Sequence, residues 1–72
     1  MMKKEQIMSQ NPRVMHGALV FAGTRVPVET LIEYLVAGDS IDTFLVDFPT
    51  VSHEQAVAYL EMTLEYANAR VA

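Results

Sequence analysis

An apolar stripe that begins directly after Pro27 is the feature that most restricts the fold. Its members recur at i, i+3, i+4, i+7 and i+8, and they are Val28, Leu31, Ile32, Leu35 and Val36. This spacing places them on one face of an α-helix. Proline suits the first helical turn and glycine suits the residue after the last one. The sequence therefore predicts a helix that starts at Val28 and stops before Gly38.

Two further helices follow. Asp39 or Ser40 can cap the second, and Pro49 ends it; its buried face is predicted to consist of Ile41, Phe44, Leu45 and Phe48. Ser52 and Gln55 have the spacing of a capping box at the start of the third. Its apolar face is predicted to contain Val57, Leu60, Leu64 and Ala67, with an end near Asn68 or Arg70.

The segment before these helices is rich in β-branched residues and is interrupted by glycine. It predicts very short strands at Arg13–Met15, Leu19–Phe21 and Arg25–Pro27. Residues 1–11 show no periodicity and are predicted to be a flexible arm, with a single domain over 12–70. The expected fold is mainly α: a three-helix body of helix-turn-helix proportions, homeodomain-like, preceded by a short β-hairpin element.

Composition further restricts the kind of protein that this chain can be. The chain has 72 residues and no cysteine, which excludes disulfides and thiolate metal sites. With 51% hydrophobic residues in so small a body, some apolar surface is expected to stay exposed, which favours a homodimer or a complex with another protein. The sequence contains no secretory signal pattern and no apolar run that could cross a membrane, so a cytoplasmic location is expected.

Charge is distributed unevenly along the chain. Residues 1–27 contain four basic residues and one acidic residue, a balance of +3. Residues 28–72 contain one basic and eight acidic residues, a balance of −7. Attraction to phosphate must therefore come from the N-terminal third, whereas the helical part should repel nucleic acid.

About residues 12–68 resemble the bacterial domain-of-unknown-function family 433. The matching features are Gly-Thr-Arg-Val-Pro-Val at 23–28, Ala-Gly at 37–38, Ser-Ile at 40–41, Phe-Pro at 48–49 and the helix after Ser52; the motif positions are Gly23, Thr24, Arg25, Pro27, Gly38 and Pro49. The resemblance implies a homeodomain-like helix-turn-helix fold, often dimeric, and a frequent role as the antitoxin of a toxin–antitoxin pair. It also implies a PIN-like, ribonuclease-type toxin as partner and, in many members, promoter DNA as a ligand.

The chain departs from the family at positions that favour DNA binding. Family members often have Lys-Pro after the lead-in glycine and a basic residue before Gly-Thr-Arg, whereas this chain has Ala18-Leu19 and Ala22. Arg13 and Arg25 remain as basic candidates for a DNA or partner contact. For Arg25 the favoured alternative is a structural or interface role, for which an ion pair with Glu29 or Glu33 is available, since an arginine fork suits either carboxylate or phosphate.

The start of the third helix would be the recognition helix of a helix-turn-helix, and its candidate contacts are Ser52, His53, Gln55 and Tyr59. Gln55 could pair with adenine. The alternative is that Gln55 closes the capping box and that Glu54 serves the helix dipole, and this account explains the same residues.

We expect no catalytic, metal or cofactor site. His16 and His53 lie in different elements, and the acidic residues of the third helix have no accompanying nucleophile or phosphate loop. The expected function is that of a small non-catalytic binding protein, an antitoxin or transcriptional-regulator-like subunit that dimerises and binds a toxin and promoter DNA. The alternative is an interaction or dimerisation module without DNA binding.

Overall fold

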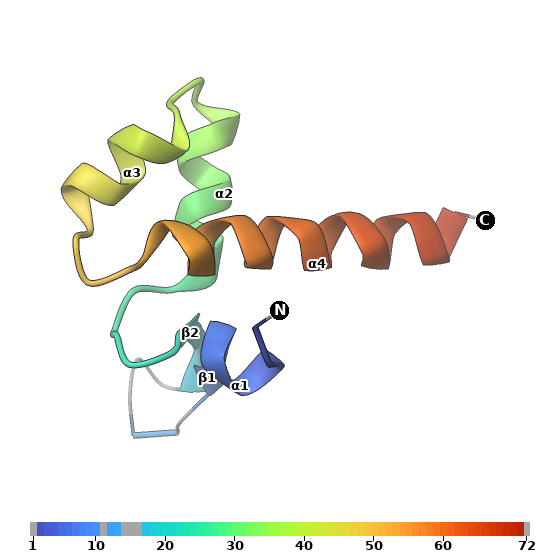
Figure 1. The fold of residues 1–72 in the computed structure, drawn as a ribbon, viewed down its shortest axis with the longest axis horizontal. Helices are drawn as coiled ribbons and strands as arrows, with labels where there is room; N and C mark the ends of the chain where they lie inside the picture. Colours follow the sequence, from blue (N-terminus) through green and yellow to red (C-terminus); the bar gives the residue numbers. More distant parts are fainter. Residues whose placement is uncertain (1, 11, 14–16, 72) are drawn as a thin grey trace.

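One long helix organises the molecule. The structure, a computed structural model, describes residues 2–10, 12–13 and 17–71. Helices α2 (Val28–Val36) and α3 (Ile41–Asp47) lie on one side of α4 (His53–Val71), and α1 (Lys4–Ile7) lies on the other side with the hairpin (Figure 1). The two strands of that hairpin are β1 (Met8–Gln10) and β2 (Leu19–Phe21). The predicted class, mainly helical with a short antiparallel hairpin before the three main helices, is confirmed.

The pairing of the hairpin differs from the expected one. β2 lies where the sequence predicts a strand, but its partner is β1, with Met8 opposite Phe21 and Gln10 opposite Leu19. The predicted strand Arg13–Met15 is not that partner: Arg13 lies in a turn, and residues 14 and 15 are outside the described residues. The predicted strand Arg25–Pro27 is reduced to one isolated bridge between Val20 and Pro27.

The expectation of a flexible arm over residues 1–11 is wrong for residues 4–10. This segment forms α1 and β1, and it buries Ile7 (4% exposed) and Met8 (9% exposed) in the core. The backbone N–H of Ala22 donates to the carbonyl oxygen of Ile7 at 3.0 Å, which extends the pairing beyond the strands. Because each element has only three or four residues, no periodicity could appear in the sequence.

The caps predicted for the main helices are confirmed. After α2, Gly38 has φ +94°, its N–H donates to Leu35, and the N–H of Asp39 donates to Tyr34. This double bond pattern is a Schellman motif, which glycine permits at its left-handed position. The Ser40 hydroxyl accepts from the N–H of Thr43 at the start of α3.

An aromatic cluster forms the centre of the core. Phe21 and Phe44 are fully buried and their ring centroids lie 6.0 Å apart. Tyr59 meets Phe21 edge-on at 5.6 Å, and Tyr34 meets Phe44 edge-on at 5.4 Å. Edge-to-face pairs at this separation stabilise beyond simple burial. The cluster therefore joins β2, α2, α3 and α4 in one core.

A hydrogen bond between a tyrosine and a carboxylate joins α2 to α3. The Tyr34 hydroxyl donates to Oδ2 of Asp47 at 2.6 Å. This hydrogen bond, with smaller contributions from desolvation and from the charges of Asp47 and Asp39, raises the pKa of Tyr34 above its ordinary value. The phenol therefore stays protonated and remains a donor at neutral pH.

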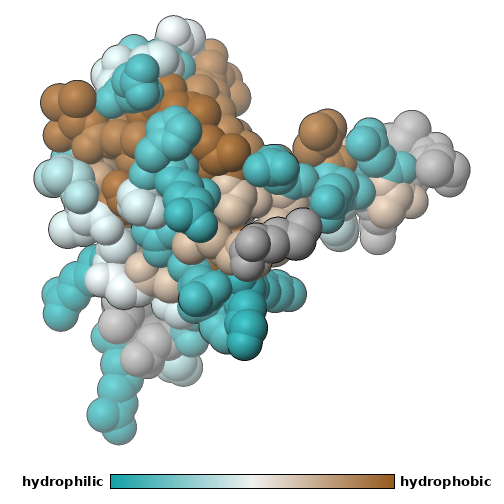
Figure 2. Space-filling model, in the orientation of Figure 1, coloured by the Kyte–Doolittle hydropathy of each residue, from teal (hydrophilic) through white to brown (hydrophobic). Residues whose placement is uncertain are grey.

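The second half of α4 extends beyond the body. Figures 1 and 2 show it standing clear of the other elements. Residues 64–69 are all exposed, and they include Leu64 at 62% and Tyr66 at 65% exposure. Among the described residues, no helix is long and apolar enough to cross a membrane.

Candidate functional site

The segment 22–27 forms a tight turn that joins β2 to α2. Gly23 has φ +77°, a left-handed conformation that disfavours other residues. The hydroxyl of Thr24 donates to the carbonyl oxygen of Phe21 at 2.8 Å and accepts from the N–H of Val26 at 3.0 Å. The N–H of Phe21 donates to Val26 at 2.9 Å, which closes the turn from the other side. The local hydrogen bonds of this turn therefore leave its backbone little freedom.

Arg25 lies within this turn, and its side chain is exposed. No hydrogen bond or ion pair joins it to any described residue. The predicted ion pair with Glu29 or Glu33 is therefore wrong. The reason is geometric: α2 begins at Val28, so Arg25 lies outside the helix, and the four-residue spacing to Glu29 does not place the two side chains on one helical face. The residues next to Arg25 hold the turn by their hydrogen bonds, while the side chain of Arg25 faces solvent.

Replacing Thr24 by valine should loosen this turn. Valine keeps the shape but removes both hydrogen bonds of the hydroxyl, and we expect a loss of about 1 kcal/mol in the free energy of unfolding. Urea denaturation followed by circular dichroism measures it. Thr50→Val is the matched control, because Thr50 is exposed and its hydroxyl forms no hydrogen bond with a described residue. An equal effect of the two substitutions would contradict the role given to Thr24.

Gln55 joins the turn to the rest of the molecule. It is 9% exposed, and its side-chain nitrogen donates to the carbonyl oxygens of Gln6 at 3.0 Å and Ala22 at 3.1 Å. Its side-chain oxygen accepts from the N–H of Ser52 at 3.0 Å, and its own N–H donates to the Ser52 hydroxyl at 3.0 Å. The predicted capping box is confirmed. Both amide donors of Gln55 are used inside the chain, so its paired contact with adenine would require breaking these bonds.

The other candidates at the start of α4 have different surroundings. Ser52 and His53 are exposed, and Ser52 is occupied by the capping box. Tyr59 is partly buried against Phe21. Burial, with a smaller contribution from the charge of Glu29, raises the pKa of Tyr59. Glu54 is also exposed beside His53, and the first turn of α4 contains no arginine or lysine.

The candidate contact residues are not gathered at one site. Arg13 is exposed in the turn after β1, and Arg25 is exposed in the turn before α2. Ser52 caps the start of α4, and the other three candidates lie on the first two turns of that helix. Within the described part of the chain, no group of three or more histidine or acidic side chains is placed to hold a metal ion. His16 lies outside the described residues.

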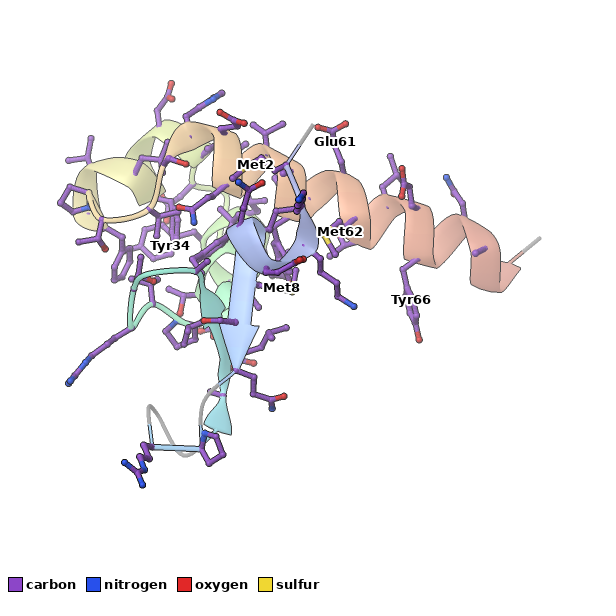
Figure 3. All side chains as sticks on the ribbon, turned by 60° about the horizontal axis from the view of Figure 1, so that its bottom comes forward. Met2, Met8, Tyr34, Glu61, Met62 and Tyr66 are labelled. Atoms are coloured by element: carbon purple, nitrogen blue, oxygen red, sulfur yellow. The ribbon has the colours of Figure 1, made fainter. Side chains whose placement is uncertain are left out.

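A groove of about 660 Å³, which sequence reasoning did not predict, lies between the hairpin and α4. Its residues on α4 are Tyr59, Met62, Thr63 and Tyr66, and its opposite wall comes from α1, β1 and β2. The four α4 positions follow the i, i+3, i+4, i+7 spacing of one helical face. Figure 3 shows Met62 and Tyr66 pointing to the side of α4 on which β1 lies, whereas Glu61 points elsewhere and lines a second hollow with Met2, Lys4 and Ile7.

The fold and the turn together define a small, mainly helical domain with an N-terminal hairpin and an arginine presented on a braced turn. The chain belongs to the family described as protein of unknown function (DUF433), whose model matches residues 8–62. The match starts at β1, which agrees with the place of this strand in the core. No curated protein and no solved structure matches the chain.

Proposed function

We propose that this chain is a small non-catalytic binding subunit of the antitoxin type, a homodimer that recognises a toxin-like partner protein through Arg25. The observation that supports this most strongly is the arginine itself. The turn is held by the bonds of Thr24 and by Gln55, so Arg25 adds nothing to its internal bonding. A guanidinium held in solvent on a braced backbone is suited to a carboxylate or phosphate of another molecule.

The charge of the chain favours a protein partner. The helical part has a balance of −7, and the first turn of α4 exposes Glu54 and contains no arginine or lysine. An acidic surface suits docking to a basic, nucleic-acid-handling protein. The antitoxin role itself comes from the family resemblance, in which the usual partner is a PIN-like, ribonuclease-type toxin.

We do not propose that the start of α4 recognises DNA bases directly. The side-chain donors of Gln55 are already bonded to Gln6 and Ala22. The carboxylate of Glu54 would face the DNA phosphates, and the first two turns of α4 contain no arginine or lysine. Contact with promoter DNA is proposed only for a complex in which the partner adds positive charge. The alternative is an interaction module that binds protein and never DNA. It differs from the proposal in one respect: its complex with the partner does not bind promoter DNA.

Replacing Arg25 by alanine should strongly weaken partner binding and leave the fold intact. The test co-expresses the tagged chain with the product of each adjacent gene and measures capture of the partner. We expect capture by the native chain, a loss of at least about tenfold in affinity for Arg25→Ala, and partial retention for Arg25→Lys, because lysine keeps the charge but not the fork.

Lys3→Ala is the matched control, since it removes one exposed positive charge outside the turn. It should leave capture unchanged. Capture of a partner equally well by Arg25→Ala would contradict the role of Arg25, and no affinity for an adjacent toxin-like protein would contradict the antitoxin role. A mobility shift of upstream DNA by the chain alone at moderate salt would contradict the exclusion of direct DNA binding.

A further inference from the structure

One face of α4 is apolar but takes no part in the groove or in the second hollow. It consists of Leu60, Leu64 and Ala67, whose i, i+4, i+7 spacing places them together. Met62, which lines both hollows, lies about half a turn around the helix from them. Because the hollows are on the side of α1 and the hairpin, this face lies on the side of α2 and α3 (Figure 1). Leu64 is 62% exposed, and Figure 2 shows apolar surface on the extending half of α4.

The outer face of α2 has two carboxylates beside an apolar pair. Ile32 and Val36 lie one turn apart, and Val36 is 82% exposed. Glu29 and Glu33, also one turn apart, are exposed next to them. Burial and, to a smaller extent, the charge of Glu29 raise the pKa of Tyr59 on α4, so this face of α2 is turned toward α4. We define the α2–α4 face as Ile32, Val36, Leu60, Leu64 and Ala67 together with Glu29 and Glu33.

The charge around the α2–α4 face has one sign. Residues 26–69 contain eight acidic residues and no lysine or arginine. Neither Glu29 nor Glu33 forms an ion pair with a described residue, so the chain leaves these two charges uncompensated. A second copy that presents the same face would place carboxylates against carboxylates. The complementary occupant is therefore a surface of another protein in which apolar residues are flanked by lysine or arginine.

The two helices also determine the form of that occupant. A helix satisfies its backbone hydrogen bonds internally, so the α2–α4 face offers side chains and no strand edge with which an extended segment could pair. An amphipathic helix likewise satisfies its own backbone and presents one apolar stripe with charges beside it. Binding of such a helix to an apolar surface between helices is a recurrent mode of recognition.

We propose that the α2–α4 face binds a basic amphipathic helix of the partner protein, with its apolar stripe on Val36 and Leu64 and its basic residues beside Glu29 and Glu33. The inference deepens the proposed function, on which it rests for the existence of a partner protein. It adds a second contact to that of Arg25, which lies in the turn before α2.

Fluorescence anisotropy with a labelled synthetic peptide tests the inference on the full chain. The probe is an amphipathic helical peptide of leucine and lysine, roughly 18 residues long so that it forms about five turns. The native chain should bind this peptide at about 0.15 M salt, where charges outside the contact are largely screened. A peptide of the same pattern with glutamate in place of lysine should bind at least about tenfold more weakly.

Two substitutions with matched controls locate the binding surface. Glu33→Lys should raise the dissociation constant of the leucine–lysine peptide at least about tenfold, whereas Asp42→Lys, the same charge reversal at an exposed position of α3, should change it less than about threefold. Leu64→Gln should also weaken binding at least about tenfold, because it removes an apolar contact. Its control is Val46→Gln on α3, where Val46 is 79% exposed. Circular dichroism checks that each variant is folded.

Three results would overturn the inference. They are a native chain that does not bind the leucine–lysine peptide, equal effects of Glu33→Lys and Asp42→Lys, and equal effects of Leu64→Gln and Val46→Gln. Sedimentation equilibrium adds a fourth: loss of self-association by Leu64→Gln would show that a second copy covers the face. Failure to capture an adjacent toxin-like protein would instead contradict the proposed function and leave the peptide result unchanged, so the two failures are distinguishable.

Discussion

Gln55→Ala should destabilise the domain by about 2–3 kcal/mol, because one side chain joins three segments. Its amide donates to Gln6 and Ala22 and accepts from Ser52. Alanine leaves two carbonyl oxygens without their donor at the junction of α1 with β1 and at the turn before α2. It also leaves a void where the side chain was buried. For a domain of this size, whose total stability is roughly 3–5 kcal/mol, the loss amounts to half or more.

Urea denaturation followed by circular dichroism measures this loss, at one protein concentration for all variants. Gln10→Ala is the matched control. Gln10 is exposed, and among the described residues its side chain makes one hydrogen bond, to the carbonyl oxygen of Gly17. It should cost less than about 1 kcal/mol. Equal losses for the two glutamines would contradict the bridging role of Gln55.

Phe44→Ala should have the largest effect, about 3–5 kcal/mol, and should leave most of the chain unfolded at room temperature. Phe44 is completely buried, and its ring contacts Phe21, Tyr34 and Phe48. Its removal opens a cavity at the point where β2, α2 and α3 meet. The chain has no disulfide to limit the consequences.

Thermal unfolding by calorimetry or circular dichroism measures the effect. The control is Val46→Ala on the same helix, because Val46 is 79% exposed and alanine is a better helix former. The unfolding free energy of this control should stay within about 0.5 kcal/mol of the native value. A cooperative transition of Phe44→Ala at the native temperature would show that the aromatic cluster is not the centre of the core.

The three main helices could be predicted from the sequence with their ends. Each has a cap that depends on residues close in sequence, such as Ser40 with Thr43 or Gly38 with Leu35. The apolar faces of α2 and α3 also have helical spacing, whereas the face predicted for α4 is wrong in its second half, because Leu64 and Ala67 are exposed. Local hydrogen bonds of this kind leave a local signal. This is why α2, α3 and α4 begin within a residue of the expected positions.

The N-terminal part could not be predicted in the same way. α1 and β1 are too short to show a period, and the strand pairing joins residues 8–10 to residues 19–21 across a connection longer than a tight hairpin turn. Their stability comes from burial of Ile7 and Met8 against distant elements. Stabilisation by packing against distant elements leaves no pattern in a short stretch of sequence.

Two features of the candidate site, the long-range bonds of Gln55 and the exposure of Arg25, could not be predicted from the sequence, for physical reasons. The capping-box pattern of Gln55 was readable, but its bonds to residues 49 and 33 positions away were not. For Arg25, the spacing to Glu29 indicates an ion pair only if both residues are helical, and the helix starts at Val28. The sequence therefore predicted the motif but assigned the structural role to the wrong member of it: Thr24 closes the turn, and the side chain of Arg25 is exposed.

The most direct test of this account is the equilibrium unfolding of Arg25→Ala. The side chain is exposed and has no partner among the described residues, so the account predicts an unfolding free energy within about 0.5 kcal/mol of the native value. The same preparation should fail to capture the partner that the native chain captures. A loss of more than about 1 kcal/mol would show that Arg25 holds the fold together, and it would contradict the claim that this arginine is kept for binding.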